Sequence, residues 1–559
     1  MNFVDVGVIG VFTLLVLICG MSFSRAGKNM TSFYAAGGAL PWWMSGLSLF
    51  MSFFSSGTFV TWGSIAYSQG LVAITIQWTM AVAGLLVGLY IAPRWNRTKV
   101  LTASQYVRDR LGAPVQKTYT YILLLIGSFS TGAFLYPVAK IVEVSTGIPL
   151  SLSIFILGSV ILVYTAVGGL WAVVVTDILQ FAVLTAAVIV VVPLSLKAVG
   201  GFNEFIERSP EGFFNLVSGD YSWTFIFVFG LYNLFFVAGN WPYVQRYTSV
   251  SSPRDAKKVG LLFGALYFVS PVIWMLPPMI YRVINPDLNG LDNEGAYLLI
   301  CKEVLPVGML GLMLGAMIFA TSSSVNTAIN LFSGVIANDV YKNLRPKSSE
   351  KNLVRVGRLA TVVLGMITIG VALLIPHMGG IVSFVFTLAA MTGGALFLPP
   401  VWALFSKYQR GELLLGVSLV TLTVNGFLKF AAPALWGLSL DREAETVVGI
   451  GLPVILLGLT EIYARIKHKD AHQYKAYREI EKSRQEADSS ISQETHSEDN
   501  RWGNKVVSLG VAATGCIMLG LSLIANESGA LVASIGGAII LLGIWGYRAG
   551  TSPPGPAGR

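Results

Sequence analysis

The sequence predicts an all-α polytopic membrane protein with about fifteen transmembrane helices. The first observation is composition: of 559 residues, 54% are hydrophobic and only 12% are charged, and the mean hydropathy is +0.67. Soluble domains carry roughly 25% charged residues, so this chain has too few charges to cover a soluble surface of its size. The second observation is that continuous apolar segments of about 20 residues, long enough to cross the hydrocarbon core as helices, recur along the chain.

The predicted membrane helices follow one another in order, mostly with short connections. They are continuous apolar runs and lack the alternating pattern of barrel strands. The fifth and sixth almost touch, at Gly168 and Gly169. The fifteen ranges are 3–22, 44–66, 71–93, 118–145, 150–168, 170–196, 222–247, 258–284, 303–340, 355–374, 379–405, 410–433, 447–465, 505–525 and 530–548.

Basic residues gather in alternate loops, which predicts the orientation of the chain. Short loops rich in Lys and Arg mark the cytoplasmic side. This places the N-terminus outside and the C-terminus in the cytoplasm of a multi-pass protein of the cell (inner or plasma) membrane. The net charge of +9 is explained by topology, so we expect no nucleic-acid partner. The loops after the first, third, seventh and ninth helices include Arg25, Lys28, Arg94, Arg97, Lys99, Arg110, Arg246, Arg254, Lys257, Lys342, Arg345 and Lys347.

Two predicted helices are interrupted in mid-membrane. Gly57 is expected to break "SFFSSGTFVTWG" (52–63), and Gly239 and Pro242 are expected to break "FFVAGNWPYVQR" (235–246). Gly and Pro are common in membrane helices, which is enough to explain either interruption alone. Corresponding interruptions in two halves instead indicate an inverted-repeat transporter with its binding site at the breaks.

These interruptions organise the chain into a main bundle with appended parts. The only sizeable polar linker lies near 466–504, and it begins with a helix-prone, mixed-charge stretch. The predicted parts are an N-terminal extra helix and loop (1–43), a first inverted repeat (44–196), a second inverted repeat (222–405), accessory helices (406–465), a cytoplasmic polar linker (466–504), two C-terminal helices (505–548) and a disordered tail (549–559).

The stretch "ATSSSVNTAIN" (320–330) places hydroxyls and amides inside an apolar segment. Small residues and serines also allow close helix packing, which explains one or two of them. An adjacent serine pair with an amide-rich flank favours an ion site, because hard cations prefer oxygen ligands. At helical spacing one face carries Ala320, Ser323, Ser324 and Thr327, flanked by Asn326.

Asp177 lies about two turns inside a predicted membrane helix, in "YTAVGGLWAVVVTDILQ" (164–180). A carboxylate at that depth is costly, and it indicates a functional site unless its side chain reaches the headgroups. A bound cation beside it would remove the cost.

Four stretches together resemble the sodium:solute symporter family, which includes bacterial sodium/galactose, sodium/proline and sialic acid transporters. The similarity covers roughly residues 1–465. It implies a LeuT-like fold of two inverted five-helix repeats, with sodium and solute bound at the breaks of their first helices. The stretches are "LPWWMSGLSLFMSFFSSGTF" (40–59), "YTAVGGLWAVVVTDILQ" (164–180), "NLFFVAGNWPYVQR" (233–246) and "ATSSSVNTAINLFSGVIANDVY" (320–341).

The resemblance also implies site residues. A main sodium site would take backbone carbonyls of Met51, Phe54 and Ala320 and hydroxyls of Ser323 and Ser324. A second sodium site would join Asp177 to Ser323, Asn326 and Thr327, although relatives have two serines where this chain has the amide and the threonine. The solute positions would be Thr58, Gln77, Asn233 and Phe236, and Tyr267 stands where the galactose transporter uses a lysine.

Together these features predict a secondary active transporter that carries a small polar organic solute with Na⁺ by alternating access. The solute could be a sugar, an amino acid or a carboxylate such as sialic acid. The expected partners are the solute, the sodium ion and the lipid bilayer, with no obligate protein partner. The alternative is a transporter-like membrane solute sensor that signals through 466–504. The four histidines have no catalytic or zinc spacing and no P-loop is present, so we expect no enzyme activity.

Overall fold

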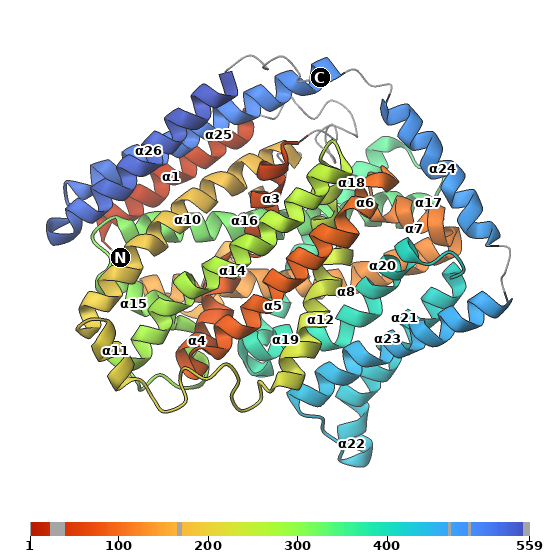
Figure 1. The fold of residues 1–559 in the computed structure, drawn as a ribbon, viewed down its shortest axis with the longest axis horizontal. Coiled ribbons are helices and arrows are strands. Elements are labelled where there is room, and N and C mark those ends of the chain that lie inside the picture. The colour runs from red at the N-terminus through yellow and green to blue at the C-terminus, as the bar shows by residue number, and fades with distance from the viewer. Residues whose placement is uncertain (1, 23–39, 165–169, 468–470, 490–492, 552–559) are drawn as a thin grey trace.

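The computed structural model describes residues 2–22, 40–164, 170–467, 471–489 and 493–551, with most of their side chains. Apart from isolated bridges, the described residues form helices and their connections (Figure 1). Within these described ranges, ten helices are long and apolar enough to cross a membrane, or eleven if the bent pair Trp223–Gly239 and Trp241–Thr248 is one span. Each of the fifteen predicted ranges overlaps a helix, but their number as membrane helices stays a prediction, because some helices are short or broken.

The first part of the chain forms the helices that carry the first interruption. They are α1 (Phe3–Met21), α3 (Trp42–Met51), η2 (Thr58–Trp62), α4 (Gly63–Gln69), α5 (Val72–Leu86), η3 (Val87–Ile91), α6 (Ala92–Thr98), α7 (Ala103–Leu111), α8 (Ala113–Thr146), α9 (Leu150–Tyr164) and α10 (Leu170–Val199).

The middle of the chain carries the second interruption and the polar stretch. Its helices are α11 (Phe202–Arg208), α12 (Trp223–Gly239), α13 (Trp241–Thr248), α14 (Pro253–Ile284), η4 (Gly290–Gly295), α15 (Ala296–Val304), α16 (Met309–Val335), η5 (Ile336–Tyr341), α17 (Lys342–Leu344), α18 (Glu350–Leu374), η6 (Ile375–Met378), α19 (Gly380–Thr392), η7 (Gly393–Phe397) and α20 (Leu398–Phe405).

The last part lies around this bundle. Its helices are α21 (Gly411–Gly426), η8 (Phe427–Ala431), α22 (Ala432–Trp436), α23 (Arg442–Lys467), α24 (His472–Ser489), α25 (Gln493–Ser522), η9 (Asn526–Ser528) and α26 (Gly529–Thr551). α25 begins inside the range predicted as linker, and α26 includes the first residues of the predicted tail, of which 552–559 lie outside the described residues.

Helix starts follow sequence signals. Ser252 precedes Pro253 and caps α14, because its hydroxyl accepts from the amide of Asp255 at 3.1 Å. Ser222 caps α12 in the same way through the amide of Phe225. Such caps satisfy orphan amides of the first turn and so fix where the membrane helices begin.

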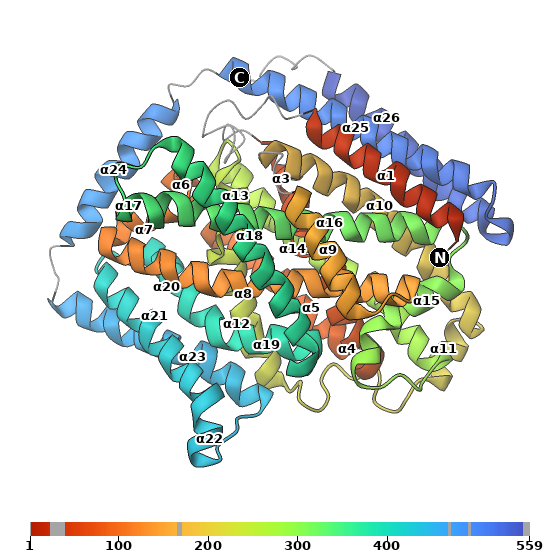
Figure 2. The same cartoon turned by 180° about the vertical axis from the view of Figure 1, so that it is seen from behind.

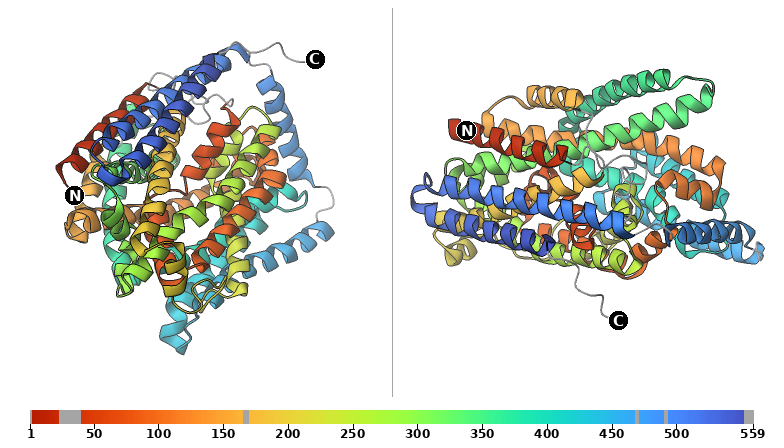
Figure 3. Two further views of the ribbon diagram at one scale, coloured as in Figure 1. Left: turned by 60° about the vertical axis from the view of Figure 1, so that its left-hand side comes forward. Right: turned by 90° about the horizontal axis from the view of Figure 1, so that it is seen from above.

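The centre of the molecule is built from α3, α5, α10, α12, α14 and α16. α14 packs on α3, α5 and α10, whereas α16 packs on α8 and α10. Seen from behind, α8, α9 and α18 cover this centre (Figure 2). α25 and α26 run side by side at one edge, next to α1 (Figure 3).

α24 docks on the end of the bundle formed by α6 and α7. Arg484 pairs with Asp109, and Gln485 donates to the carbonyl of Arg97 at 2.8 Å. Beneath α24 lies Arg110, which was counted among loop cations but is fully buried and donates to the carbonyl of Ser406 at 2.7 Å. Burial lowers the pKa of the Arg110 guanidinium. The helix-prone beginning of the predicted linker is therefore a packed helix.

Asp5 ties α1 to the start of α16. Its Oδ1 accepts from the amides of Gly308 and Gly311 at 2.9 and 3.1 Å, and its side chain is buried. An Asp5→Ala variant should lose about 1–2 kcal/mol of stability, because it removes a cap and a negative charge at a helix N-terminus. Thermal unfolding of the detergent-purified protein measures this loss. Asp5→Asn keeps an acceptor oxygen and should lose less; equal melting temperatures for Asp5→Ala and wild type would contradict the capping role.

Candidate functional site

The first interrupted helix breaks between α3 and η2. In a continuous helix the amides of Ser55 and Thr58 would bond to the carbonyls of Met51 and Phe54. Here the amide of Ser55 donates to Thr58 Oγ1 at 3.3 Å, and the amide of Thr58 donates to the carbonyl of Ser55 at 2.9 Å. The carbonyls of Met51 and Phe54 are thus released from the helical ladder. They are two of the oxygens predicted to bind sodium.

The break lies against α16, which carries the polar stretch. The amide of Ser56 donates to Thr321 Oγ1 at 3.2 Å, and the two hydroxyls lie 2.8 Å apart. Ser56 Oγ also donates to the carbonyl of Met317 at 3.1 Å. These bonds join the break to the turn of α16 that includes Ala320, a second element of the predicted sodium site.

The remaining predicted sodium ligands follow along α16. Ser324 Oγ donates to the carbonyl of Ala320 at 3.2 Å, so both groups lie on one face of the helix. Ser323, Asn326 and Thr327 belong to α16, but their side chains lie outside the described residues. The break thus lies against the helix that carries Ala320 and Ser324. That the Met51 and Phe54 carbonyls form one sodium site with them stays a prediction.

Gly57 does not cause the break, contrary to the sequence prediction. It has helical dihedral angles, φ −58° and ψ −35°. The non-helical residues precede it, at 52–55. Side-chain hydroxyls create the interruption instead: Thr58 Oγ1 donates to the carbonyl of Phe53 at 2.6 Å, and Thr321 captures the amide of Ser56.

The second interrupted helix breaks where the sequence predicted. α12 and α13 meet at an angle of 55°, and Asn240 between them is extended at φ −77°, ψ 122°. Pro242 lies in the first turn of α13, where a missing amide costs little. A Cβ on Gly239 would come within 2.3 Å of the carbonyl oxygen of Phe397, so glycine allows this close approach to η7.

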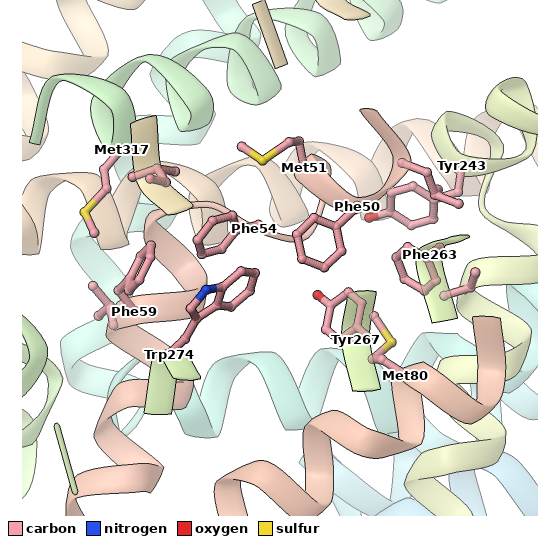
Figure 4. Packing of buried hydrophobic residues seen from close by; sticks show 14 of the residues in the cluster. Phe50, Met51, Phe54, Phe59, Met80, Tyr243, Phe263, Tyr267, Trp274 and Met317 are labelled. Atoms are coloured by element: carbon pink, nitrogen blue, oxygen red, sulfur yellow. The ribbon is translucent and has the colours of Figure 1, made fainter. Parts of the chain in front are cut away.

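Aromatic rings fill the space between the two breaks. The ring of Phe53, in the first break, lies 4.3 Å from that of Tyr243 and 6.0 Å from that of Phe236, which flank the second break. The ring centroid of Tyr267 of α14 lies 6.2 Å from that of Phe53 and 5.2 Å from that of Phe50. Figure 4 shows Phe50 near Tyr267 and Phe54 stacked on Trp274, with Met51 directed away from these rings. The rings connect both broken helices to α14.

Three of the four predicted solute residues, Thr58, Gln77 and Asn233, are buried, and Phe236 is partly buried. Asn233 of α12 donates to Thr79 Oγ1 of α5 at 2.7 Å, while Thr58 shapes the first break. Gln77 of α5 is 3% exposed, and within the described part of the chain its Nε2 has no hydrogen-bond partner. Phe236 belongs to the aromatic group. Sequence reasoning missed Phe53 and Tyr243, although each lies within three residues of an interruption.

Asp177 forms a buried polar cluster with α3 and α13. Ser48 Oγ donates to Asp177 Oδ2 at 2.5 Å and accepts from Arg246 Nε at 2.9 Å; Arg246 Nη2 lies 3.7 Å from Asp177 Oδ2. Arg246 was expected in a basic loop, but it lies in α13 and is 6% exposed, because the carboxylate compensates its charge. The predicted second sodium site at Asp177 stays a prediction. Only the depth of Asp177 in the membrane pointed to this cluster.

Comparison with known proteins agrees with this geometry. A model of the sodium:solute symporter family matches residues 33–411. The sodium/glucose cotransporter of Vibrio parahaemolyticus is 27% identical over 514 residues, covering 84% of this chain and 92% of that protein. Mouse solute carrier family 5 member 4B is 24% identical, and the match covers 83% of this chain and 77% of that protein. Mouse sodium/glucose cotransporter 1 is 27% identical, but the match covers only 65% of this chain and 62% of that protein.

Two solved structures share the fold. A substrate-bound, outward-open Na⁺-coupled sialic acid symporter superposes with a TM-score of 0.66 at 21% identity, covering 83% of this chain and 98% of that one. A nucleobase-cation-symport-1 family transporter in a closed conformation superposes with a TM-score of 0.51 at 15% identity. The match covers 80% of this chain and 98% of that one. These are transporters with the LeuT fold, and the relatives are transporters and not enzymes. The chain belongs to the sodium:solute symporter family, whose coupling ion is sodium.

Proposed function

We propose that the protein is a secondary active transporter that carries a small polar organic solute together with Na⁺. The observation that carries this proposal is the release of the Met51 and Phe54 carbonyls at a break that bonds to α16 through Ser56 and Thr321. Neutral carbonyl and hydroxyl oxygens suit a monovalent hard cation that must be bound and then released. Ser323 would complete the main site.

Sodium at this position would couple the two ligands. The ion would hold the break of α3 against α16, and this would stabilise the form of the protein that accepts solute. Each ligand then raises the affinity for the other by the same factor. Loss of sodium to the cytoplasm would weaken solute binding. Thr58, Gln77, Asn233 and Phe236 would surround the solute, and the aromatic group would close one side of it.

The polar cluster of Ser48, Asp177 and Arg246 suits alternating access. Ser48 bonds to Asp177 and to Arg246, so it links α3 to α10 and α13. Separation of these helices would open the path on that side. The positions 44–196 and 222–405 would be the two inverted repeats, each starting with a broken helix. The N-terminus would lie outside the cell membrane and the C-terminus in the cytoplasm, with α24 on the cytoplasmic face.

Uptake into proteoliposomes tests this function. Purified protein is first screened by thermal shift against sugars, amino acids and carboxylates including sialic acid, each with Na⁺ and with K⁺. A solute that stabilises only with Na⁺ is then offered to proteoliposomes with an inward Na⁺ gradient, and we expect accumulation that dissipating the gradient abolishes. Sodium-dependent binding without accumulation would contradict transport and favour a solute sensor.

A further inference from the structure

We propose that Gln180 of α10 is a further sodium-contacting residue, whose side-chain amide oxygen faces the main sodium site. This inference rests on the proposed function. Gln180 is 1% exposed, and in the described residues neither its Oε1 nor its Nε2 has a hydrogen-bond partner. A buried amide without partners destabilises a folded protein, so a residue of this kind indicates a ligand.

Two contacts between α3 and α10 fix the depth of Gln180. Ser48 bonds to Asp177, and two residues further along α3 the ring of Phe50 lies 5.8 Å from that of Phe181. Later residues of one helix therefore meet later residues of the other, so both helices run in the same direction. Gln180 lies between these two contacts in height, about level with Phe50 and Met51.

The helical register fixes the side on which Gln180 lies. Successive residues are rotated by about 100°, so Phe181 and Gln180 lie about 40° and 60° to opposite sides of Asp177. Phe181 contacts Phe50, whose ring also contacts Tyr267 and Trp274, so its side is that of α14. Gln180 is on the other side.

The packing around α10 identifies that other side as α16. Leu179 lies at the back of α10, where its Cδ2 would be 2.4 Å from a Cβ on Gly510 of α25. The helices that pack most extensively on α10 are α3, α14, α16, α25 and α1, with α11, α15 and α26 in smaller contacts. α1 packs on both α25 and α16. The break that follows α3 bonds to α16 through Ser56 and Thr321, so α16 lies toward the α3 side of α10, the side of Gln180. This places the Gln180 amide toward the region between the break and α16, where the carbonyls of Met51 and Phe54 are released.

The chemistry of the side chain suits sodium. The amide oxygen is a neutral hard ligand, and the unpaired amide can rotate to present it. Asp177 lies less than one turn from Gln180 along α10. Gln180 therefore lies between the proposed main sodium site and the charged cluster of Asp177 and Arg246. The ligand is sodium itself and not the solute, because the predicted solute residues outside the break, Gln77, Asn233 and Phe236, lie on α5 and α12 and not on α10 or α16.

Sodium titration of Gln180→Leu tests this inference without any solute. Binding is measured as sodium-dependent thermal stabilisation and as ²²Na⁺ binding to purified full-length protein. We expect an apparent affinity roughly tenfold weaker than wild type, comparable to other losses in a metal's ligand environment. In sodium-free buffer the melting temperature should stay the same or rise, because the variant removes an unpaired buried amide. An unchanged sodium affinity would overturn the inference.

Thr185→Val is the matched control. Its hydroxyl is also buried without a partner in the described residues, but the register places it about 80° from Asp177 on the side of Phe181. It should leave sodium affinity unchanged. If Gln180→Leu does not fold, Gln180→Glu replaces it and should bind sodium more tightly because it adds negative charge; an unchanged affinity would again overturn the inference.

Two outcomes separate this inference from the proposed function. If Ser324→Ala weakens sodium binding but Gln180→Leu does not, only the role of Gln180 fails. If wild-type protein binds no sodium in either assay, the proposed function fails with it.

Discussion

Replacing Ser323 and Ser324 together by alanine should abolish sodium-driven uptake while the protein remains folded. Each hydroxyl is a proposed ligand of the main sodium site, and a lost ligand contact of about 1.4 kcal/mol weakens affinity tenfold. The double variant should therefore bind sodium at least about a hundredfold more weakly. Serine hydroxyls bond back to their own helix, as Ser324 does to Ala320, so their removal leaves α16 intact. Initial uptake rates across a sodium series measure the effect.

Ser322→Ala is the control for this experiment. Ser322 is the neighbouring serine in the same stretch, about 100° around the helix from Ser323. It should transport with wild-type sodium dependence, and both variants should elute as single species in size-exclusion chromatography. Sodium dependence that is unchanged in the Ser323 and Ser324 double variant would remove these hydroxyls from the site.

Replacing Arg246 by glutamine should destabilise the protein by about 3–5 kcal/mol, the range for breaking a buried ion pair by removing one partner. Among the described side chains, Asp177 would then be a buried carboxylate with Ser48 as its one remaining donor. Thermal and chemical unfolding in detergent measure the loss. A double variant, Asp177→Asn with Arg246→Gln, should recover more than half of it, because no unpaired charge remains.

Lys197→Gln is the control, since it breaks an ion pair with Glu527 in which both side chains are exposed. Its unfolding curve should coincide with that of wild type. If Arg246→Gln unfolds like wild type, the cluster at Ser48 does not hold α3, α10 and α13 together.

The single variant Asp177→Asn separates two possible roles of this acid. A changed number of sodium ions per solute would support the predicted second sodium site, and an unchanged number with reduced stability would support the ion pair alone.

The sequence predicted the helical membrane fold and the positions of both breaks, but local composition explains only the fold and the second break. Apolar length identifies a membrane helix whatever its neighbours are. Gly239 and Pro242 mark the second break directly, since one permits close approach and the other lacks an amide. The sodium positions at the first break and on α16 come from the family resemblance and stay predictions.

The parts that the sequence could not provide depend on contacts between distant helices. The first break is made by Thr58 and Thr321, which capture amides, and nothing in "SFFSSGTF" identifies Thr321 as a partner. Arg246 looks like a cytoplasmic loop cation until Asp177 is seen beside it. α24 docks through the pair of Arg484 with Asp109 and through Tyr474 over Arg110, and both partners are far from α24 along the chain.

The reciprocity of sodium and solute binding tests the central claim most directly. Solute affinity is measured with and without saturating Na⁺, and sodium affinity with and without saturating solute, on the same purified protein. If sodium at the α3 break favours the solute-binding form, the two factors are equal, and both fall to one in the Ser323→Ala, Ser324→Ala double variant. Solute binding that is the same in Na⁺ and in K⁺ would contradict the account.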